Sequence, residues 1–358
     1  MNQLHLYRAH LTHNYKVLRN HLDSATQLIG VVKAGAYGSD ALAFALHLEQ
    51  LGIDRLAVAY TAEGIALRKG GVQCPIMVFY PQFETLEALL QHNLEPVAYS
   101  FRILHRLEQL ASTPIPLHLK FNTGLNRLGF ALSDLDAVLS KSVSNSFSLQ
   151  SIYSHLAASE EDRPNALSES QIKKFNALQK KCQNKIPQEV LFHLLNSSGI
   201  FNYPEYQYGA VRSGLALYGF ANQAHWDVEL KPVARLTSTV LQIHQVAKGD
   251  TVGYNAGWVA PKASLIATLP LGHADGISRH SGHGKTWVTL GGKKAPIVGN
   301  VCMDMVMIDV TEIECEEGDE VEFFGFENTA ETLAKQADTI AYELLSNVGP
   351  RVERIVHP

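Results

Sequence analysis

The feature that most limits the fold is a rhythm of eight short strand-like runs in the first two-thirds of the chain. These runs are rich in β-branched and aromatic residues, and amphipathic helical stretches such as 40–51 and 85–92 separate them. They end near Lys33, Tyr60, Tyr80, Ser100, Lys120, His155, Asn196 and Arg212. Strands that alternate with helices pair in parallel, and eight such units in about 200 to 250 residues predict a TIM-like (β/α)8 barrel.

The chain beyond about residue 220 follows another pattern. Alternating β segments, broken by Gly and Asp turns, are expected at 237–246, 264–269, 286–290, 295–308 and 320–324. One late helix is expected at 332–338. Because no second set of strand–helix units occurs there, we predict the barrel over residues 1–225 and a separate, mostly-β C-terminal domain over residues 226–358.

Composition limits the classes of function. The chain has 358 residues, of which 46% are hydrophobic, and a net charge of -5, which allows two packed cores and gives no sign of nucleic-acid binding. Its four cysteines are far apart and lack metal spacing, which favours a reducing cytoplasm over a disulfide framework. We find no signal-peptide pattern and no helix-length apolar run, so we expect no membrane segment.

Lys33 gives the strongest functional signal. It ends an apolar run and is followed by a Gly-rich turn in the segment VVKAGAYG, residues 31–38. A lysine is rarely buried alone, so its position indicates either a snorkelling side chain or a chemical role. The glycines allow close approach of the backbone, and the hydroxyl of Tyr37 suits an anionic group beside an amine nucleophile.

Five segments, in this order along the chain, resemble motifs of the alanine racemase family. Residues 31–38 resemble its pyridoxal-phosphate lysine motif, and residues 118–130 resemble a barrel segment that bears an active-site arginine. Residues 211–219 are similar to its eighth-strand motif, 252–254 to its second catalytic segment and 299–304 to its substrate loop. Several motifs in the family's order argue strongly against a chance likeness.

The resemblance implies a pyridoxal-phosphate enzyme that interconverts L-alanine and D-alanine and supplies D-alanine for peptidoglycan. Lys33 is matched to the lysine that carries the cofactor and serves as one base. Racemisation needs proton transfer on both faces of a planar carbanion, and the resemblance assigns the second base to Tyr254. A phenol with a pKa of about 10 is a poor base near neutrality. The family's hydrogen-bonded relay, matched to His155 and Arg212, is expected to stabilise the phenolate.

Arg212 is also matched to an arginine that faces the pyridine nitrogen. An arginine does not readily give up its proton, so the ring nitrogen stays unprotonated and the cofactor becomes a weaker electron sink. The family pattern implies that this choice suppresses transamination. For the phosphate, the matched groups are the hydroxyls of Tyr37 and Ser197 and the backbone N–H groups of Gly214 and Leu215.

The substrate carboxylate is matched to Arg127 and to the backbone N–H of Met303. Lys120 is matched to a lysine that is carbamylated in part of the family, which turns a cation into an anion able to hold Arg127. No metal is expected. His273 and Pro350 stand at positions where family members have tyrosine, and we expect them to alter the shape of the entrance.

The resemblance further implies a head-to-tail homodimer whose active sites are shared, because Tyr254 and Met303 are matched to residues that reach the lysine of the other subunit. Three alternatives stay open: a racemase of this fold for another small amino acid such as serine, a decarboxylase, and a non-catalytic pyridoxal-phosphate-binding protein. The Val-Gly-Tyr and Cys-Met-Asp segments count against a decarboxylase. Tyr254 and the β domain count against a non-catalytic binder.

Overall fold

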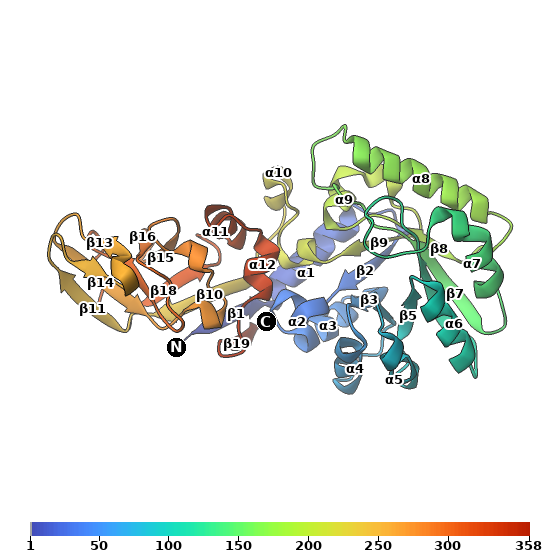
Figure 1. Cartoon of the computed structure of the whole chain (residues 1–358), viewed down its shortest axis with the longest axis horizontal. Coiled ribbons are helices and arrows are strands. Elements are labelled where there is room, and N and C mark those ends of the chain that lie inside the picture. The colour runs from blue at the N-terminus through green and yellow to red at the C-terminus, as the bar shows by residue number, and fades with distance from the viewer. Residues whose placement is uncertain (1) are drawn as a thin grey trace. The chain divides into compact units, whose positions relative to one another are not determined.

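The computed structural model describes residues 2–358, which form two compact units (Figure 1). The barrel unit and the β unit are each built from separate stretches of sequence: 11–36 and 41–231 for the barrel unit, and 2–10, 37–40 and 232–358 for the β unit. The boundary between residues 225 and 226 stays a prediction. The structure adds that the first strand of the chain belongs to the β unit.

Eight parallel strands close the barrel, and the first pairs with the last (Figure 1). They are β2 (Gln27–Val31), β3 (Arg55–Val58), β4 (Ile76–Val78), β5 (Glu95–Ala98), β6 (Ile115–Lys120), β7 (Phe147–Tyr153), β8 (Leu191–His193) and β9 (Ala210–Ser213). Every residue of β3 and β4 is buried, as parallel strands covered on both faces require. The predicted (β/α)8 barrel is confirmed, and each strand ends within a few residues of its predicted end.

Helices alternate with the barrel strands. They are α1 (Arg8–Asn20), α3 (Ala41–Gln50), α4 (Thr61–Lys69), α5 (Leu86–Gln91), α6 (Phe101–Leu110), α7 (Leu135–Ser142), α8 (Ala166–Cys182), α9 (Ser197–Asn202) and α10 (Ala224–Asp227). Helix α6 begins where Ser100 accepts the N–H of Ile103, and it buries Ile103, Leu104 and Leu107 on one face. Within residues 2–358, we find no helix long and apolar enough to cross a membrane.

The β unit is built on one nine-stranded sheet with the strand order β11-β14-β17-β16-β15-β18-β10-β1-β19. Its strands are β1 (Gln3–Tyr7), β10 (Ala234–Thr239), β11 (Gln242–Val246), β14 (Ser264–Leu269), β15 (Trp287–Leu290), β16 (Lys293–Val298), β17 (Val306–Asp309), β18 (Glu320–Phe324) and β19 (Glu353–His357). A smaller sheet pairs β12 (Thr251–Val252) with β13 (Trp258–Val259), and two helices, α11 (Ala330–Gln336) and α12 (Ala341–Ser346), complete the unit. The predicted mostly-β domain is confirmed.

Two predicted strands of this unit are wrong in extent. The expected strand 237–246 is interrupted at Val240 and Leu241 and forms β10 and β11, which lie apart in the sheet order. The expected strand 295–308 is interrupted by the loop 299–305 between β16 and β17. Val240 and Leu241 are apolar, so the first interruption carries no turn signal, whereas Gly299 and Asn300 in the second are residues that turns favour.

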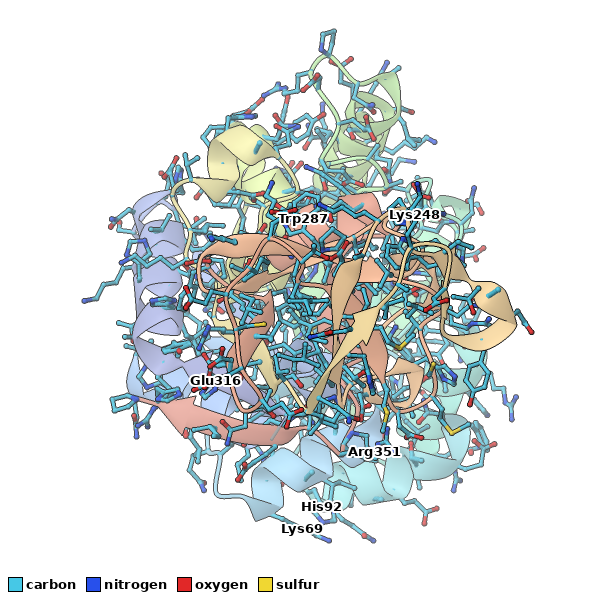
Figure 2. All side chains as sticks on the ribbon, turned by 90° about the vertical axis from the view of Figure 1, so that its left-hand side faces the viewer. Lys69, His92, Lys248, Trp287, Glu316 and Arg351 are labelled. Atoms are coloured by element: carbon cyan, nitrogen blue, oxygen red, sulfur yellow. The ribbon has the colours of Figure 1, made fainter. Side chains whose placement is uncertain are left out.

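The turn of the hairpin between β15 and β16 does have a signal in the sequence. Gly291 and Gly292 form its turn with φ angles of 55° and 75°, the left-handed backbone that tight two-residue hairpins require. On the paired strands, the Lys294 ammonium lies 4.1 Å from the centre of the Trp287 ring, which Figure 2 labels. This cation–π contact adds a side-chain link to the hairpin.

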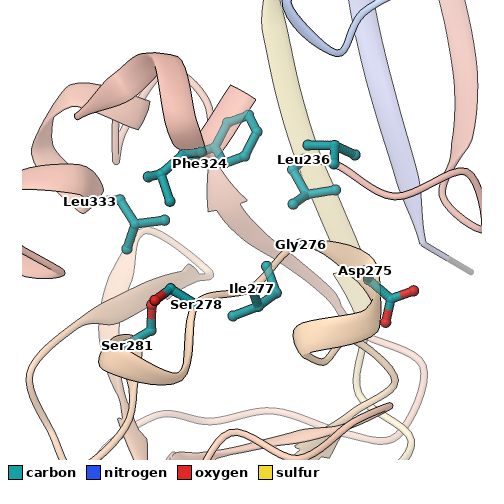
Figure 3. A pocket seen from close by; sticks show the side chains of 10 residues that line it. Leu236, Asp275, Gly276, Ile277, Ser278, Ser281, Phe324 and Leu333 are labelled. Carbon is teal, nitrogen blue, oxygen red and sulfur yellow. The ribbon is translucent and has the colours of Figure 1, made fainter. Parts of the chain in front are cut away.

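The β unit also contains a small cavity between the sheet and the loop of Ile277 (Figure 3). Leu236, Phe324 and Leu333 supply its apolar lining, and its volume is about 10 Å³. A cavity of that size has room for roughly one water molecule. It is therefore a packing feature, too small for a cofactor or an amino acid.

Candidate active site

A left-handed turn directly follows Lys33. The four residues after this lysine, Ala34 to Tyr37, have φ angles of 52°, 65°, 55° and 57°. Only glycine adopts this region at low cost, and strained backbone of this kind gathers at functional sites. The Glu63 carboxylate supports the turn by accepting the N–H of Ala34 at 2.6 Å and that of Ala59 at 2.7 Å. The segment labelled α2 (Lys33–Tyr37) in Figure 1 is this turn.

Four cationic side chains act on one another at the C-terminal ends of the barrel strands. Burial lowers the pKa of Lys33, and the charge of Arg127 lowers it further, against the opposing effect of Glu63. Burial also lowers the pKa of Lys120 to about 8, with added repulsion from Arg127, Arg212 and Lys33. Like charges at close range disfavour each other's charged form. The arrangement therefore favours an anionic ligand.

Arg127 lies on a loop that is closed at its base. The N–H of Phe130 donates to the carbonyl of Lys120 at 2.8 Å, and the N–H of Asn122 donates to the carbonyl of Phe130 at 2.9 Å. The Asn122 side chain accepts the N–H of Gly124 at 3.0 Å, which makes a local turn of the kind asparagine favours. The loop is thus ordered, while the Arg127 side chain itself is exposed.

Arg212 is buried on β9 and is held by five acceptors from the end of β8 and from the loops that follow β7 and β8. It donates to the carbonyls of Ser154 at 2.8 Å and Leu194 at 3.0 Å, and it contacts Nδ1 of His155 at 3.2 Å and Nδ1 of His193 at 2.6 Å. The fifth acceptor is the His193 carbonyl at 3.5 Å. Arginine has only donors, so both Nδ1 atoms accept.

His155 is therefore a neutral imidazole with a fixed tautomer. Burial lowers its pKa well below the usual value, and the charge of Arg212 lowers it further. Since Nδ1 accepts from Arg212, the ring proton is on Nε2. Burial also lowers the pKa of Arg212 to about 10, so the guanidinium is still charged near neutrality. The pair presents one positive charge and one neutral N–H donor.

The loops after β8 and β9 meet at Ser197. Its Oγ accepts the N–H of Gly214 at 3.0 Å and that of Ala216 at 3.2 Å. Leu215 lies between these two residues and begins a short 3₁₀ turn. These are the seventh and eighth strands of the barrel, whose loops commonly bind phosphate in this fold. The structure thus brings Ser197, Gly214 and Leu215 together.

Tyr37 belongs to the β unit. Its buried ring lies 5.8 Å, centre to centre, from the ring of Tyr342, and burial raises the pKa of its hydroxyl. The hydroxyl therefore stays neutral and can donate a hydrogen bond.

Tyr254 and Met303 lie on loops of the β unit and are exposed by 71% and 59%. The backbone of both loops is well held. Asn300 Nδ2 donates to the carbonyl of Tyr254 at 2.7 Å, and the carbonyl of Met303 accepts the N–H of Ala274 at 3.0 Å. The exposure thus belongs to the side chains on ordered loops.

Arg351 ties together the segments that carry His273 and Pro350. Its guanidinium contacts Asp275 at 2.9 Å, two residues after His273, and Asp304 at 2.7 Å, at the end of the predicted substrate loop (Figure 2 labels Arg351). Pro350 directly precedes this arginine. His273 and Pro350, the two departures from the family pattern, therefore lie in segments that the ion pairs of Arg351 hold together.

The predicted site residues fall into two groups. The barrel unit contains Lys33, Lys120, Arg127, His155, Ser197, Arg212, Gly214 and Leu215. The β unit contains Tyr37, Tyr254 and Met303. Among residues 2–358, we find no cluster of side chains that suits a metal ion.

Both halves of the chain match models of one family. The model described as alanine racemase, N-terminal domain, matches residues 7–222, and the model described as alanine racemase, C-terminal domain, matches residues 233–356. The chain belongs to the alanine racemase family. An alanine racemase of Sorangium cellulosum is 36% identical over 97% of this chain and 96% of the relative. One of Thermodesulfovibrio yellowstonii is 34% identical over 96% and 94%.

Solved alanine racemase structures have the same fold. One from Clostridium difficile has a TM-score of 0.93 at 29% identity and covers 99% of this chain and 95% of its own. A biosynthetic enzyme from Pseudomonas aeruginosa has a TM-score of 0.92 at 28% identity, with 100% and 99% covered. One from Bartonella henselae, with covalently bound pyridoxal phosphate, has a TM-score of 0.90 at 27% identity, with 99% of both chains covered.

Three supporting residues escaped the sequence analysis. Glu63 holds the turn after Lys33, His193 holds Arg212, and Asn300 holds the loop of Tyr254. Glu63 had a signal, because an acidic residue at the third position of a helix reaches back to the N-terminal backbone, and here it accepts the N–H of Tyr60 at 3.0 Å. His193 and Asn300 had no such signal, since their partners are distant in sequence.

Proposed function

We propose that this chain is a pyridoxal-phosphate-dependent racemase that interconverts L-alanine and D-alanine. The observation that carries the proposal is the cationic mouth of the barrel, where Lys33, a lysine of lowered pKa, lies near Arg127 and Lys120 and where Arg212 contacts His155. This arrangement occurs in a chain that belongs to the alanine racemase family over nearly its full length.

The residues present fit the cofactor. The Ser197 hydroxyl and the backbone N–H of Leu215 suit the phosphate, and the Gly214 N–H, which donates to Ser197 Oγ, orients that hydroxyl group. Arg212 has its two terminal nitrogens engaged by the protein, and among residues 2–358 its Nε–H has no described acceptor, so it remains for a ring nitrogen. When bound, pyridoxal phosphate supplies the conjugated ring that accommodates the electrons left by the departing α-proton.

The chain's own residues then have separate tasks. Lys33 would hold the cofactor, and its free amine would take or give the α-proton on one face, which its lowered pKa favours near neutrality. Tyr254 serves the opposite face. The exposed guanidinium of Arg127 and the N–H of Met303 bind the substrate carboxylate. The Nε2–H of His155 is a donor toward a phenolate.

Lys120 is proposed as a site of carbamylation. A carbamate forms from the neutral amine, and burial beside three cations lowers the pKa of Lys120 to about 8. The product is an anion, so it replaces repulsion of Arg127, Arg212 and Lys33 by attraction. Both effects favour the modified lysine.

We also propose a homodimer with shared active sites. Tyr254 and Met303 are large apolar or amphipathic side chains that lie mostly exposed on ordered loops of a single chain. Such residues are typical of surfaces that become covered on assembly. Mixing inactive Lys33→Ala with inactive Tyr254→Phe subunits tests this. With random association, half of the dimers are hybrids with one intact site of two, so roughly a quarter of wild-type activity is expected to return.

In that experiment, labelled subunits monitor exchange. Wild-type subunits mixed with Lys33→Ala subunits are the control, because they gain no new site. If subunits exchange and no activity returns, Lys33 and Tyr254 act within one chain and the shared site is wrong.

The cellular role follows from the chemistry. The four cysteines, Cys74, Cys182, Cys302 and Cys315, are all unpaired, which fits a reducing cytoplasm. There the enzyme supplies D-alanine for peptidoglycan.

Chiral analysis of the product tests the function directly. Purified protein with pyridoxal phosphate is expected to convert L-alanine, and separately D-alanine, to the same mixture of both enantiomers. L-Serine in a parallel assay separates a racemase of another small amino acid from an alanine racemase. Release of carbon dioxide would indicate a decarboxylase, and cofactor binding without turnover of any amino acid would indicate a non-catalytic binder.

A further inference from the structure

A continuous file of polar side chains crosses the interior of the barrel, where branched apolar residues are the rule. Six of the eight strands supply its members, which are Arg55, Glu95, His118, Ser151, His193 and Arg212. All six are buried, and none is more than 9% exposed. Burial of so many polar groups is costly unless each is hydrogen-bonded, and each member is bonded to the next.

At the Arg55 end, this series of hydrogen-bonded side chains finishes in an ion pair. Arg55 Nε donates to Glu95 Oε2 at 2.6 Å, and the same oxygen lies 3.0 Å from His118 Nε2. His118 Nδ1 in turn lies 2.6 Å from Ser151 Oγ, on the strand paired with its own. Burial alone would raise the pKa of Glu95, but the hydrogen bonds from His118 and Arg55 and the positive charge of Arg55 hold it well below its usual range. Glu95 is thus an ionised acceptor.

The other half of the series runs from Ser151 through His193 to Arg212. Ser151 Oγ lies 2.9 Å from His193 Nε2, and His193 Nδ1 lies 2.6 Å from Arg212 Nη1. Burial lowers the pKa of His118, and burial together with the charge of Arg212 lowers that of His193 well below the usual value. Near neutral pH these shifts favour the neutral form of both imidazoles, with one ring proton each.

The two ends then determine the direction of every hydrogen bond between them. Arg212 only donates, so His193 Nδ1 accepts and the His193 proton is on Nε2, where it donates to Ser151 Oγ. The Ser151 hydroxyl is left to donate to His118 Nδ1. The His118 proton is consequently on Nε2 and donates to the ionised Glu95, which only accepts. No other assignment satisfies all the groups with two neutral histidines.

We propose that Glu95, His118 and Ser151 are positioning residues for the reaction, because Ser151 accepts the Nε2–H of His193 and, with His118 and Glu95 bonded behind it, stabilises the His193 tautomer whose Nδ1 accepts from Arg212. If His193 carried its proton on Nδ1 instead, that N–H would face an Arg212 N–H and repel it. The guanidinium would then lose its hold on the side opposite His155. The inference rests on the proposed function only in the role given to Arg212.

The first test observes the tautomers directly. In holoenzyme labelled with ¹⁵N-histidine, long-range ¹H–¹⁵N spectra distinguish an Nδ1–H from an Nε2–H imidazole. We expect Nε2–H, neutral signals for both His118 and His193 at neutral and alkaline pH. His118→Gln and His193→Gln variants assign the signals. A cationic His118, or an Nδ1–H tautomer of His193, would overturn the proposal whether or not the protein racemises alanine.

The second test cuts the file at Ser151. Ser151→Ala is expected to lower kcat about tenfold, as loss of an outer hydrogen-bonding partner does in other sites, with KM changed less than about threefold. It should also give His193 a mixture of tautomers and shift the pH profile of kcat. Ser151→Thr keeps the hydroxyl and is expected to restore most of the activity. Ser148→Ala, exposed on the same strand, is the control.

The third test separates the effect of hydrogen-bond direction from the effect of the negative charge on Glu95. Glu95→Gln keeps an acceptor oxygen for His118 and Arg55 but removes the negative charge, so the tautomers are expected to persist and kcat to change less than in Ser151→Ala. If Ser151→Ala folds, keeps the wild-type tautomer of His193 and keeps the wild-type kcat and pH profile, the file has no positioning role. A positioning role is equally excluded if Ser151→Thr fails to recover activity although it restores the tautomer.

Discussion

The barrel unit and the β unit hold their proposed site residues in opposite ways. In the barrel, Lys120 and Arg212 are buried at strand ends, and several side-chain hydrogen bonds also hold Arg212. In the β unit, Tyr254 and Met303 stand on loops with ordered backbone and exposed side chains. The barrel residues are pre-organised by the fold of one unit, whereas the side chains of the two loop residues are mostly exposed.

The difference teaches where each kind of chemistry belongs. Side chains that tune charge need a dry and rigid setting, because electrostatic interactions are strongest there. A base that approaches the substrate from the open side needs access. Substitutions in the barrel should therefore change cofactor chemistry as a whole, while substitutions in the β-unit loops should remove one selective step and leave the cofactor bound.

The largest effect is expected at Lys33. Lys33→Ala removes the only amine that the proposal gives to both cofactor attachment and proton transfer, so activity should fall at least about a thousandfold. Borohydride reduction of the wild-type protein, followed by peptide mapping, should place the pyridoxyl group on Lys33. Lys120→Met is the matched lysine variant and should still be labelled. Label on Lys120 in the wild type would contradict the assignment.

Tyr254→Phe should have a large but one-sided effect. If Tyr254 serves one face and Lys33 the other, the variant should still exchange solvent deuterium into D-alanine but no longer into L-alanine. The rate of racemisation should fall by a factor of roughly 10² to 10⁴. Cofactor absorbance should be unchanged. Loss of exchange from both enantiomers together with loss of cofactor would show that Tyr254 has a structural role and would erase the contrast between the units.

The fold was predictable where neighbours in sequence decide it. Helices separate the barrel strands, and a fully buried strand such as β4 leaves a short apolar run that the sequence displays. The pairing of β1 with β19 was missed, because it joins Gln3–Tyr7 to Glu353–His357 and so leaves no local pattern. Helix α12 was missed as well; its six residues are too few for a clear period.

The candidate site was predictable where a motif marks it, and the supporting groups were not. Lys33 and Arg212 lie in recognisable segments, but no local pattern indicates that Arg212 is bonded to His193. The left-handed turn after Lys33 was missed too, since only Gly35 among Ala34, Gly35 and Ala36 favours that backbone. Contacts that form only when the barrel closes join residues far apart in sequence, so they are seen in the structure and not in the sequence.

Lys120 is expected to have a moderate effect on the free energy of unfolding, and that effect should depend on pH. Its pKa is about 8 in the folded protein and about 10.5 for an unperturbed lysine, so the unfolded chain binds the proton more tightly. Stability should therefore rise with pH between about 8 and 10.5, and the lysine's charge should cost stability below pH 8, by roughly 1 to 3 kcal/mol. In carbonate-free buffer, Lys120→Met should raise the free energy of unfolding at pH 7 and abolish the rise.

Lys174→Met, at an exposed position of α8, is the control for that measurement and should change neither quantity. With ¹³C-bicarbonate added, a carbamate signal should appear in the wild type and be absent from Lys120→Met. A wild-type protein whose stability is flat from pH 8 to 10.5 and that gains no carbamate would show that Lys120 is well solvated, against its burial in the barrel.

The smallest effect is expected at Tyr153, which tests how completely the barrel satisfies its buried groups. Its ring stacks on His193 with centres 4.7 Å apart, but its buried hydroxyl has no hydrogen-bond partner among residues 2–358. Tyr153→Phe should therefore raise the free energy of unfolding by about 1 kcal/mol in urea titrations. Tyr218 is the matched control, because its buried hydroxyl donates to the carbonyl of Val31 at 2.9 Å, and Tyr218→Phe should lower stability by about as much. Equal losses in both variants would mean that the Tyr153 hydroxyl does find a partner in solution.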